Sequence, residues 1–354
     1  MPKEQTQQSQ PLIGSESFPV VGIDLSADES RPSGICLLKG RRAKTTLVRT
    51  DEEIVGAVRQ WNPTLVAIDA PLTRPPGRRR MEEAGPYHLR SCDRALLRRR
   101  ISFFPITLGG MRKLTERGIR LRRRLQRLGF HVIEVYPGGA QDLLGLPRKQ
   151  KDLDGLREGL RRIGIQGLSA KANHDELDAA TAALVGYLFL SGKAKVLGSK
   201  RQGAIVMPSP QVAYPDLFVS GLKLYWSGYY WHSHEKFEEL WRESQGAKAA
   251  FLKALIQLNA AFIHAERREW RGVANLLGRV ASYLSQCPDR MMGLSVRELM
   301  KTVRRLRQAA EELLMGKRKR FPWSLKPRLV PLGLLGPSGW RLRRAKDDLP
   351  RRNG

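Results

Sequence analysis

The chain of 354 residues has only three cysteines, Cys36, Cys92 and Cys287, and no two of them form a CxxC pair. Their separation argues against a disulfide framework and against a zinc site built on thiolates. The longest apolar run, AALVGYLFL at 182–190, is far shorter than the roughly 20 residues that span a bilayer, and the first residues contain no apolar signal core. These absences predict a cytoplasmic protein with no membrane association.

Acidic residues are also scarce, with 34 Asp and Glu against 63 Lys and Arg, so the net charge is +29. Residues 78–127 carry +12 of this charge and residues 316–354 carry +10. Positive charge concentrated in two segments favours nucleic acid as the partner, although a solvated, solubilising surface is the alternative for any charge run. The sequence does not distinguish DNA from RNA, and it identifies no protein partner.

Hydrophobic patterning in the first half predicts an ordered series of strands and helices. Three short strands separated by turn residues suggest an antiparallel meander, and two later strands each follow a predicted helix. Capping boxes at Thr50 with Glu53, and at Asn173 with Glu176, mark the first and last helices. The predicted strands cover 19–25, 34–39, 44–49, 64–69 and 130–136, and the predicted helices cover 51–61, 111–128 and 174–191. The order β-β-β-α-β-α-β-α is that of the ribonuclease H fold.

Acidic residues stand at the ends of these predicted elements. Asp24 ends the first strand, Asp69 ends the fourth, and Glu134 lies within the fifth. Asp175 and Asp178 are three residues apart in the first turn of the last helix, so they share a face. Clustered carboxylates are the ligands of Mg²⁺ or Mn²⁺, and such ions support phosphodiester cleavage. The five acids are therefore catalytic candidates, with Asp24, Asp69, Asp175 and Asp178 as metal ligands; turn formation and helix-dipole compensation are the alternatives.

Five segments in the first half together resemble the domain-of-unknown-function family 429. They are GIDLS at 22–26, AIDAPL at 67–72, RSCDRALLRR at 90–99, VIEVYPGGAQDLLGL at 132–146 and HDELDAATAALVGYL at 174–188. The resemblance implies a predicted metal-dependent nuclease with a ribonuclease H-like α/β fold. The HDELDA segment is similar to the closing helix of the Holliday-junction-resolvase branch of that fold.

Arginines after the Asp69 strand are candidates for holding phosphates beside the acids. The resemblance adds a signature at Arg90, Cys92, Asp93 and Arg94, for which a phosphate-binding arginine pair and a structural ion pair both remain open. The predicted nucleic-acid-binding residues are Arg78, Arg79, Arg80, Arg90, Arg94 and Arg98.

The second half changes to helical patterning after the Gly/Lys-rich stretch at 192–201. Segments 229–242 and 251–266 resemble the domain-of-unknown-function family 309, which is all-helical and has no assigned chemistry. We therefore predict a disordered N-terminus at 1–17, a ribonuclease H-like domain at 18–210, an all-α helical bundle domain at 211–315, and a basic Pro/Gly-rich tail at 316–354.

Polar residues in the predicted bundle form a second candidate site. His234 and Glu238 lie at i, i+4 spacing, as metal ligands often do, but Glu238 stands where a His-Glu-x-x-His protease has its second histidine. A buried polar network that fixes helix register is the favoured interpretation. The cluster comprises His234, Glu235, Glu238, Trp241, Gln257 and His264.

Three hypotheses of function follow. The first is a Mg²⁺- or Mn²⁺-dependent nuclease, a hydrolase of phosphodiesters, with an appended helical domain. The second is a nucleic-acid-binding protein on a catalytically inactive ribonuclease H-like scaffold. The third is a metal-dependent small-molecule hydrolase centred on the helical domain. Close approach of Asp24, Asp69 and Asp178 favours the first over the second, and a metal site at His234 favours the third.

Overall fold

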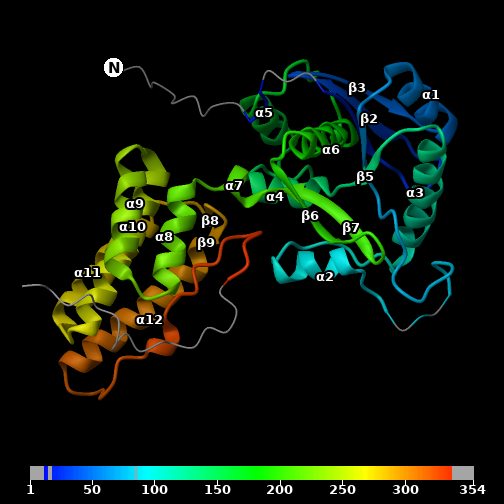
Figure 1. Cartoon of the computed structure of the whole chain (residues 1–354). Helices are drawn as coiled ribbons and strands as arrows, with labels where there is room; N and C mark the ends of the chain where they lie inside the picture. Colours follow the sequence, from blue (N-terminus) through cyan, green and yellow to red (C-terminus); the bar gives the residue numbers. More distant parts are fainter. Residues whose placement is uncertain (1–11, 15–17, 84, 86, 337–354) are drawn as a thin grey trace, which may run out of the picture. The chain divides into compact units, whose positions relative to one another are not determined.

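A computed structural model describes residues 12–14, 18–83, 85 and 87–336 (Figure 1). The chain divides into two compact units, residues 1–213 and 214–354. The first unit is a mixed α/β structure and the second is helical, as the sequence predicts.

The first unit is built on a five-stranded sheet. Strands β1, β2 and β3 pair in antiparallel fashion, whereas β4 pairs in parallel with both β1 and β5. The register places Asp24 of β1 beside Asp69 of β4, so that both carboxylates emerge at the same end of neighbouring strands. In the sheet order β3-β2-β1-β4-β5, the strands are β1 (Pro19–Asp24), β2 (Ser33–Lys39), β3 (Arg42–Val48), β4 (Leu65–Asp69) and β5 (Val132–Glu134).

Helices cover both faces of this sheet. The buried side chains of β1 alternate: Val20 packs in a cluster with α6 residues, and Val21 and Ile23 pack in a cluster with α1 and α3 residues. Both predicted capping boxes form, at the starts of α1 and α6. The helices are α1 (Asp51–Trp61), α2 (Ser91–Arg98), α3 (Gly109–Arg127), α4 (Pro137–Leu144), α5 (Leu153–Ile163), α6 (His174–Leu190) and α7 (Pro210–Ala213).

Two glycines bring α6 close to the sheet. A Cβ atom on Gly22 would stand 2.1 Å from the carbonyl oxygen of Ala179, and one on Gly34 would stand 2.1 Å from that of Asp175. Only glycine permits this backbone contact. The contact sets the first turn of α6, with its acidic residues, against the strand end that carries Asp24.

A β-hairpin of β6 (Ala194–Ser199) and β7 (Gly203–Pro208), not predicted from the sequence, lies within the first unit in the Gly/Lys-rich stretch and just after it. It packs on α2, where Gly198 is so close to the backbone of Cys92 that a Cβ atom would stand 2.7 Å from its nitrogen. The sequence of β6, AKVLGS, gives little strand signal, because it contains a lysine and a glycine and most of its side chains are exposed.

Part of the N-terminal segment predicted to be disordered is packed. Ile13 is fully buried, the Leu12 amide donates to the carbonyl of Ile163, and the Gly14 amide donates to the Tyr187 hydroxyl. The prediction of disorder is therefore wrong for residues 12–14. Residues 1–11 and 15–17 lie outside the described residues.

The second unit is a bundle around one long apolar helix, α10. This helix is the one candidate for a membrane span among the described residues, yet half of its apolar window is buried because it packs between α9 and α11. Its apolar composition is thus accounted for by the bundle core. The elements are α8 (Asp216–Trp226), α9 (Tyr230–Arg242), α10 (Gly246–Glu266), α11 (Trp270–Leu284), β8 (Arg290–Met291), β9 (Leu294–Ser295), α12 (Val296–Leu314) and a 3₁₀ turn at Trp323–Leu325.

The predicted basic tail does not begin at residue 316. Phe321, Leu329 and Leu332 are buried in the helical unit, and the hydroxyls of Tyr214 and Tyr225 donate to carbonyls at residues 332 and 327. These anchors recur at irregular spacing among Pro, Gly and basic residues, so no periodic pattern reveals them. The prediction of a basic tail therefore applies only to residues 337–354, which lie outside the described residues.

Candidate functional site

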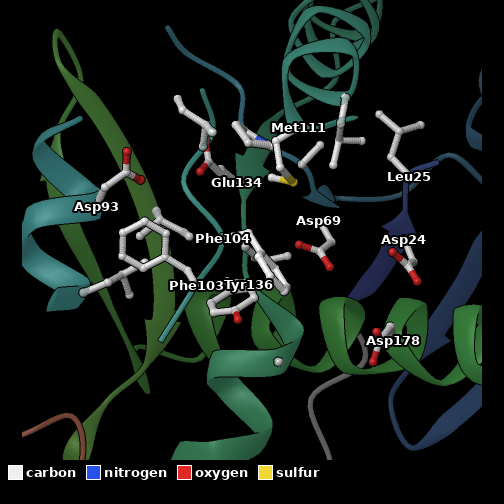
Figure 2. Close-up of a pocket in the computed structure, with 18 of the residues that line it drawn as sticks. Asp24, Leu25, Asp69, Asp93, Phe103, Phe104, Met111, Glu134, Tyr136 and Asp178 are labelled. Atoms are coloured by element: carbon white, nitrogen blue, oxygen red, sulfur yellow. The ribbon is translucent and has the colours of Figure 1, made fainter. Parts of the chain in front are cut away.

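Three of the predicted acids meet at one point of the first unit. Asp24 and Asp69 come from adjacent parallel strands, and Asp178 comes from the first turns of α6 (Figure 2). One carboxylate oxygen of each lies within 4.8 Å of the others. We call these three residues the acid triad. It is the only group of three or more potential metal ligands found in the part of the chain that the structure describes.

The surroundings of the acid triad oppose its negative charge. Burial raises the pKa of Asp24 to about 7, with Lys149 acting against this rise and Asp178 and Asp175 adding to it. Burial and the neighbouring Asp24 and Asp178 raise the pKa of Asp69 well above its ordinary value. Like charges this close need a compensating cation to remain ionised together.

Lys149 supplies a cation to the acid triad. Its Nζ lies 2.8 Å from Asp178, 3.2 Å from Asp24 and 3.7 Å from Asp175. Burial alone would lower the pKa of Lys149, but the carboxylates of Asp24 and Asp178 outweigh burial and raise it. Sequence reasoning missed this residue because the loop PRKQK at 147–151 matches no motif and gives no reason to select one lysine.

The acid triad fits a hard divalent cation. It offers oxygen donors only, from three separate elements, and a single ammonium group offsets only part of their negative charge. Mg²⁺ and Mn²⁺ prefer carboxylate and water oxygens. Asp175 lies at the margin of the site, where it contacts Lys149 and pairs with Nδ1 of His174.

Glu134, predicted as a fifth catalytic acid, is engaged elsewhere. Its two oxygens each accept a hydrogen bond of 2.8 Å from the Arg90 guanidinium, and one also accepts from the Leu72 amide at 2.7 Å. Arg90 further pairs with Asp93 at 2.9 Å and is 2% exposed. The structure therefore places Glu134 in a buried ion pair with Arg90 and outside the acid triad, which argues against the predicted catalytic role.

Arg90 is likewise placed in a buried ion pair, with its guanidinium turned to Glu134 and Asp93. Burial lowers its pKa, but Glu134 and Asp93 outweigh burial and hold it above the ordinary arginine value. The signature at 90–94 left a phosphate-binding arginine pair and a structural ion pair as alternatives. The geometry of Arg90 is that of the structural ion pair. The prediction that Arg90 binds nucleic acid is corrected accordingly.

The other predicted nucleic-acid-binding arginines differ in exposure. Arg78 and Arg94 are partly buried. Arg78 donates to carbonyls of its own loop, and Arg94, on α2, donates to the Leu89 carbonyl in the same loop, so both organise it. Arg79, Arg80 and Arg98 are exposed and remain candidates for phosphate contact.

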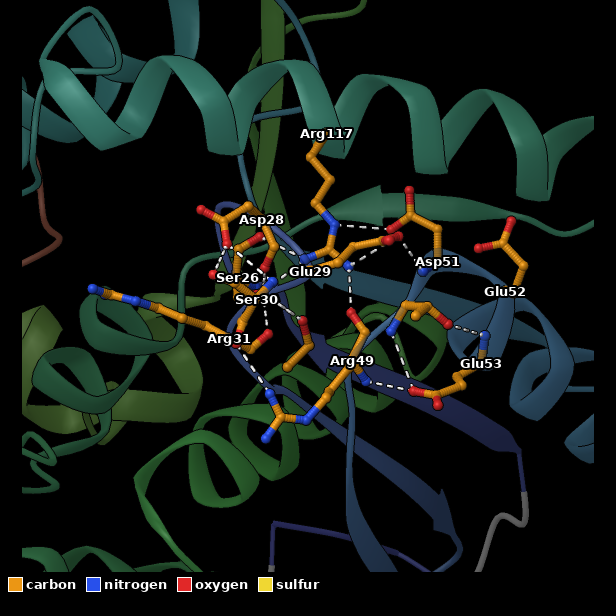
Figure 3. Close-up of polar contacts among 12 residues, drawn as sticks. Ser26, Asp28, Glu29, Ser30, Arg31, Arg49, Asp51, Glu52, Glu53 and Arg117 are labelled. Carbon is orange, nitrogen blue, oxygen red and sulfur yellow. Dashed lines mark hydrogen bonds and ion pairs between the residues drawn. The ribbon is translucent and has the colours of Figure 1, made fainter.

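A buried arginine on α3 fixes the loop that follows Asp24 (Figure 3). Arg117, 2% exposed, donates to the Ser26 hydroxyl at 2.7 Å, to the Arg49 carbonyl at 2.9 Å and to the Asp51 carboxylate at 2.9 Å. It thereby joins the β1–β2 loop to the start of α1. Sequence reasoning missed this role because Arg117 is one of 16 basic residues in its segment.

The polar cluster predicted in the helical unit does not come together. His234 Nδ1 is 3.8 Å from a Glu238 oxygen and has no hydrogen-bond partner, and His264 pairs instead with Glu269. Gln257 Oε1 is also buried without a partner. The other two members have different surroundings: Glu235 is exposed, and Trp241 lies under the Lys253 ammonium at 3.9 Å. Neither the predicted polar network nor a metal site forms from these residues.

His234→Ala should therefore leave the metal content of the full chain unchanged and lower the free energy of unfolding by about 1 kcal/mol or less, as for a partly exposed pair. Elemental analysis and denaturant unfolding of both proteins measure these quantities. Stoichiometric zinc or iron that disappears in the variant would contradict this expectation.

The comparisons with known proteins agree with this division of the chain. A family model described as protein of unknown function (DUF429) matches residues 22–202, which is more than half of the chain, and the chain belongs to this family. A second model, domain of unknown function (DUF309), matches residues 218–276 of the helical unit. No curated protein matches the chain.

Proposed function

We propose that this protein is a nuclease that depends on a divalent metal ion and uses the acid triad to hold that ion. The observation that carries the proposal is the approach of oxygens from Asp24, Asp69 and Asp178 to within 4.8 Å of one another. Three acids placed at the ends of separate elements converge, whereas turn formers or helix-dipole partners have no reason to do so.

The arrangement of the strands supports a ribonuclease H-like fold. Three antiparallel strands lead into two parallel ones in the order β3-β2-β1-β4-β5, and a long helix carries the last acid. Such a fold accommodates many activities, so the acid triad, and not the fold, is the basis of the functional argument.

In the proposed reaction, Asp24, Asp69 and Asp178 hold Mg²⁺ or Mn²⁺, and Asp175 adds negative charge at the margin. The bound ion would activate a water molecule and stabilise the leaving oxygen of a phosphodiester. Lys149 contacts one oxygen of Asp24 and one of Asp178, so its ammonium would compete with the ion for these carboxylates. An ion that took its place would leave this ammonium available to a phosphate.

The partner in this proposal is DNA or RNA, held by the exposed arginines Arg79, Arg80 and Arg98. The protein acts in the cytoplasm and needs no membrane. An inactive scaffold that only binds nucleic acid would keep this charge but would not need the acid triad. The hydrolase hypothesis for the helical unit has no supporting ligand cluster among the residues described there.

A cleavage assay tests the proposal. Purified full-length protein is incubated with single-stranded, duplex, hybrid and branched substrates in Mg²⁺, in Mn²⁺ or in EDTA. We expect cleavage of at least one substrate in either metal and none in EDTA. Cleavage that persists in EDTA, or no cleavage of any substrate in either metal, would contradict the proposal.

Removal of residues 337–354 should weaken nucleic-acid binding without unfolding the helical unit, whose anchors at 321–332 remain. The deleted segment carries six Lys and Arg and two Asp. If several of these cations contact phosphates, the slope of log affinity against log salt should fall by roughly 0.7 to 0.9 per lost contact. Binding titrations at four salt concentrations measure the slope, and an unchanged slope would mean that the segment does not contact phosphates.

A further inference from the structure

A cavity of about 230 Å³ lies directly against the acid triad. One wall carries Asp24, Asp69 and Asp178, and Arg148, Lys149 and Gln150 line it from the loop before α5. Apart from Arg90, Asp93 and Glu134, the lining away from the acid triad is mainly apolar and comes largely from α2, α3 and the segment between them. Its apolar residues include Leu96, Phe103, Phe104, Ile106, Met111 and Leu114.

Three aromatic side chains line this cavity. Phe103, Phe104 and Tyr136 lie between Asp93 and Asp69 in Figure 2. Phe104 is 75% exposed, which is unusual for a phenylalanine beside an apolar wall. A large exposed apolar side chain at the rim of a cavity indicates a ligand with an apolar face.

A ligand of this cavity has to fit both the acid triad and the apolar part of the lining. Sites for drug-sized molecules usually measure roughly 300 to 1,000 Å³, so this smaller cavity suits one ring system. The acid triad with its cation suits a phosphate group. A nucleobase with its attached phosphate has both properties, because its flat face stacks on aromatic rings.

Base pairing in a duplex prevents a base from stacking its face on an aromatic side chain. Stacked, paired bases present only their edges, so a base must be unpaired and turned out before its face can lie on a side chain. Single-stranded nucleic acid offers such bases without the cost of opening a pair.

We propose that this cavity receives one unpaired nucleobase, stacked on Phe104, and thereby sets the phosphate attached to it over the acid triad. The inference rests on the proposed nuclease function and makes an unpaired nucleotide its substrate class. The same chemistry occurs in a free nucleotide and in a strand, and the experiment separates these two sources.

The test uses 2-aminopurine, a fluorescent base whose emission changes when it stacks. Full-length protein is titrated in EDTA into a 2-aminopurine mononucleotide, a single-stranded oligonucleotide and a fully paired duplex. The variants are Phe104→Ala, Phe104→Trp and, as a matched control, Tyr87→Ala. Tyr87 is 54% exposed in the same unit and does not line the cavity.

We expect quenching and tight binding with the single strand, and roughly 5- to 150-fold weaker binding of that strand by Phe104→Ala, as for the loss of one stacked base. Phe104→Trp should retain the quenching and the tight binding, and Tyr87→Ala should match the unsubstituted protein in both. Stronger binding of the strand than of the mononucleotide identifies a strand as the source, and equal binding identifies a free nucleotide; either result supports the cavity as a base site.

Equal quenching with the duplex, or equal affinity of Phe104→Ala and Tyr87→Ala, would overturn the inference. Because the titration is done in EDTA, its result does not depend on cleavage. Quenching that depends on Phe104, in a protein that cleaves nothing in Mg²⁺ or Mn²⁺, would contradict the nuclease proposal while the base site stands. Cleavage without quenching that depends on Phe104 would support the nuclease proposal and contradict the base site.

Discussion

Replacing Asp24 or Asp69 by asparagine should lower the rate of metal-dependent cleavage by roughly two orders of magnitude or more. Each substitution removes one charged ligand with almost no change in volume, and a bound ion contributes several kcal/mol of transition-state stabilisation. Single-turnover cleavage of the best substrate, in saturating Mg²⁺ or Mn²⁺, measures the rate.

Asp154→Asn is the matched control for these variants. It makes the same chemical change in the same unit, but the Asp154 side chain is 89% exposed and lies outside the acid triad. We expect its rate to equal that of the unsubstituted protein. Full activity in both Asp24→Asn and Asp69→Asn would show that the acid triad is not the catalytic site.

Asp24→Asn should not destabilise the metal-free protein. Folding raises the pKa of Asp24 from 3.8 to about 7. Between pH 3.8 and about pH 7, Asp24 therefore keeps a proton in the folded chain that it has lost in the unfolded chain. Stability of the unsubstituted protein therefore falls as pH rises through this range. Asp24→Asn does not titrate, so in EDTA its melting temperature should rise relative to the unsubstituted protein from pH 5 to pH 8. A relative decrease would contradict the raised pKa.

The second large effect concerns folding. Arg90→Met should lower the free energy of unfolding by about 3–5 kcal/mol, because it leaves the buried carboxylates of Glu134 and Asp93 without their cation. The loss should appear in denaturant unfolding of the full chain as a lower midpoint for the first unit.

Arg98→Met provides the control, since Arg98 is an exposed arginine on the same helix. Its expected change is within about 0.5 kcal/mol. If Arg90 instead served to bind phosphate, Arg90→Met would weaken nucleic-acid binding and leave the unfolding midpoint unchanged. That pattern would contradict the structural role.

Much of the first unit follows from local signals in the sequence. The capping boxes at Thr50 and Asn173 define helix starts because each satisfies backbone N–H groups within four residues. Short apolar runs bounded by turn residues define the strands of the sheet. The grouping of Asp24, Asp69 and Asp178 could be predicted because strand ends and a helix start are positions that the fold brings together.

The remaining features depend on contacts between segments far apart in the chain. Lys149 reaches Asp24 across 125 residues, and no local pattern selects it from 63 basic residues. The signature at 90–94 singles out Arg90 but does not identify its partner Glu134, 44 residues away. Glu134 is the last residue of β5, yet its carboxylate faces Arg90 and not the acid triad. In the bundle, helical spacing placed His234 and His264 on suitable faces, but the packing of α11 gives His264 a different partner in Glu269.

Binding of Mn²⁺ to the full-length protein, followed by electron paramagnetic resonance of the free ion, tests the acid triad most directly, since it requires no knowledge of the substrate. The unsubstituted protein should bind at least one Mn²⁺ per chain, Asp69→Asn should lose that binding, and Asp154→Asn should keep it. Removing the competing ammonium in Lys149→Met should strengthen the binding. No Mn²⁺ binding by the unsubstituted protein, or equal binding by Asp69→Asn, would contradict the account.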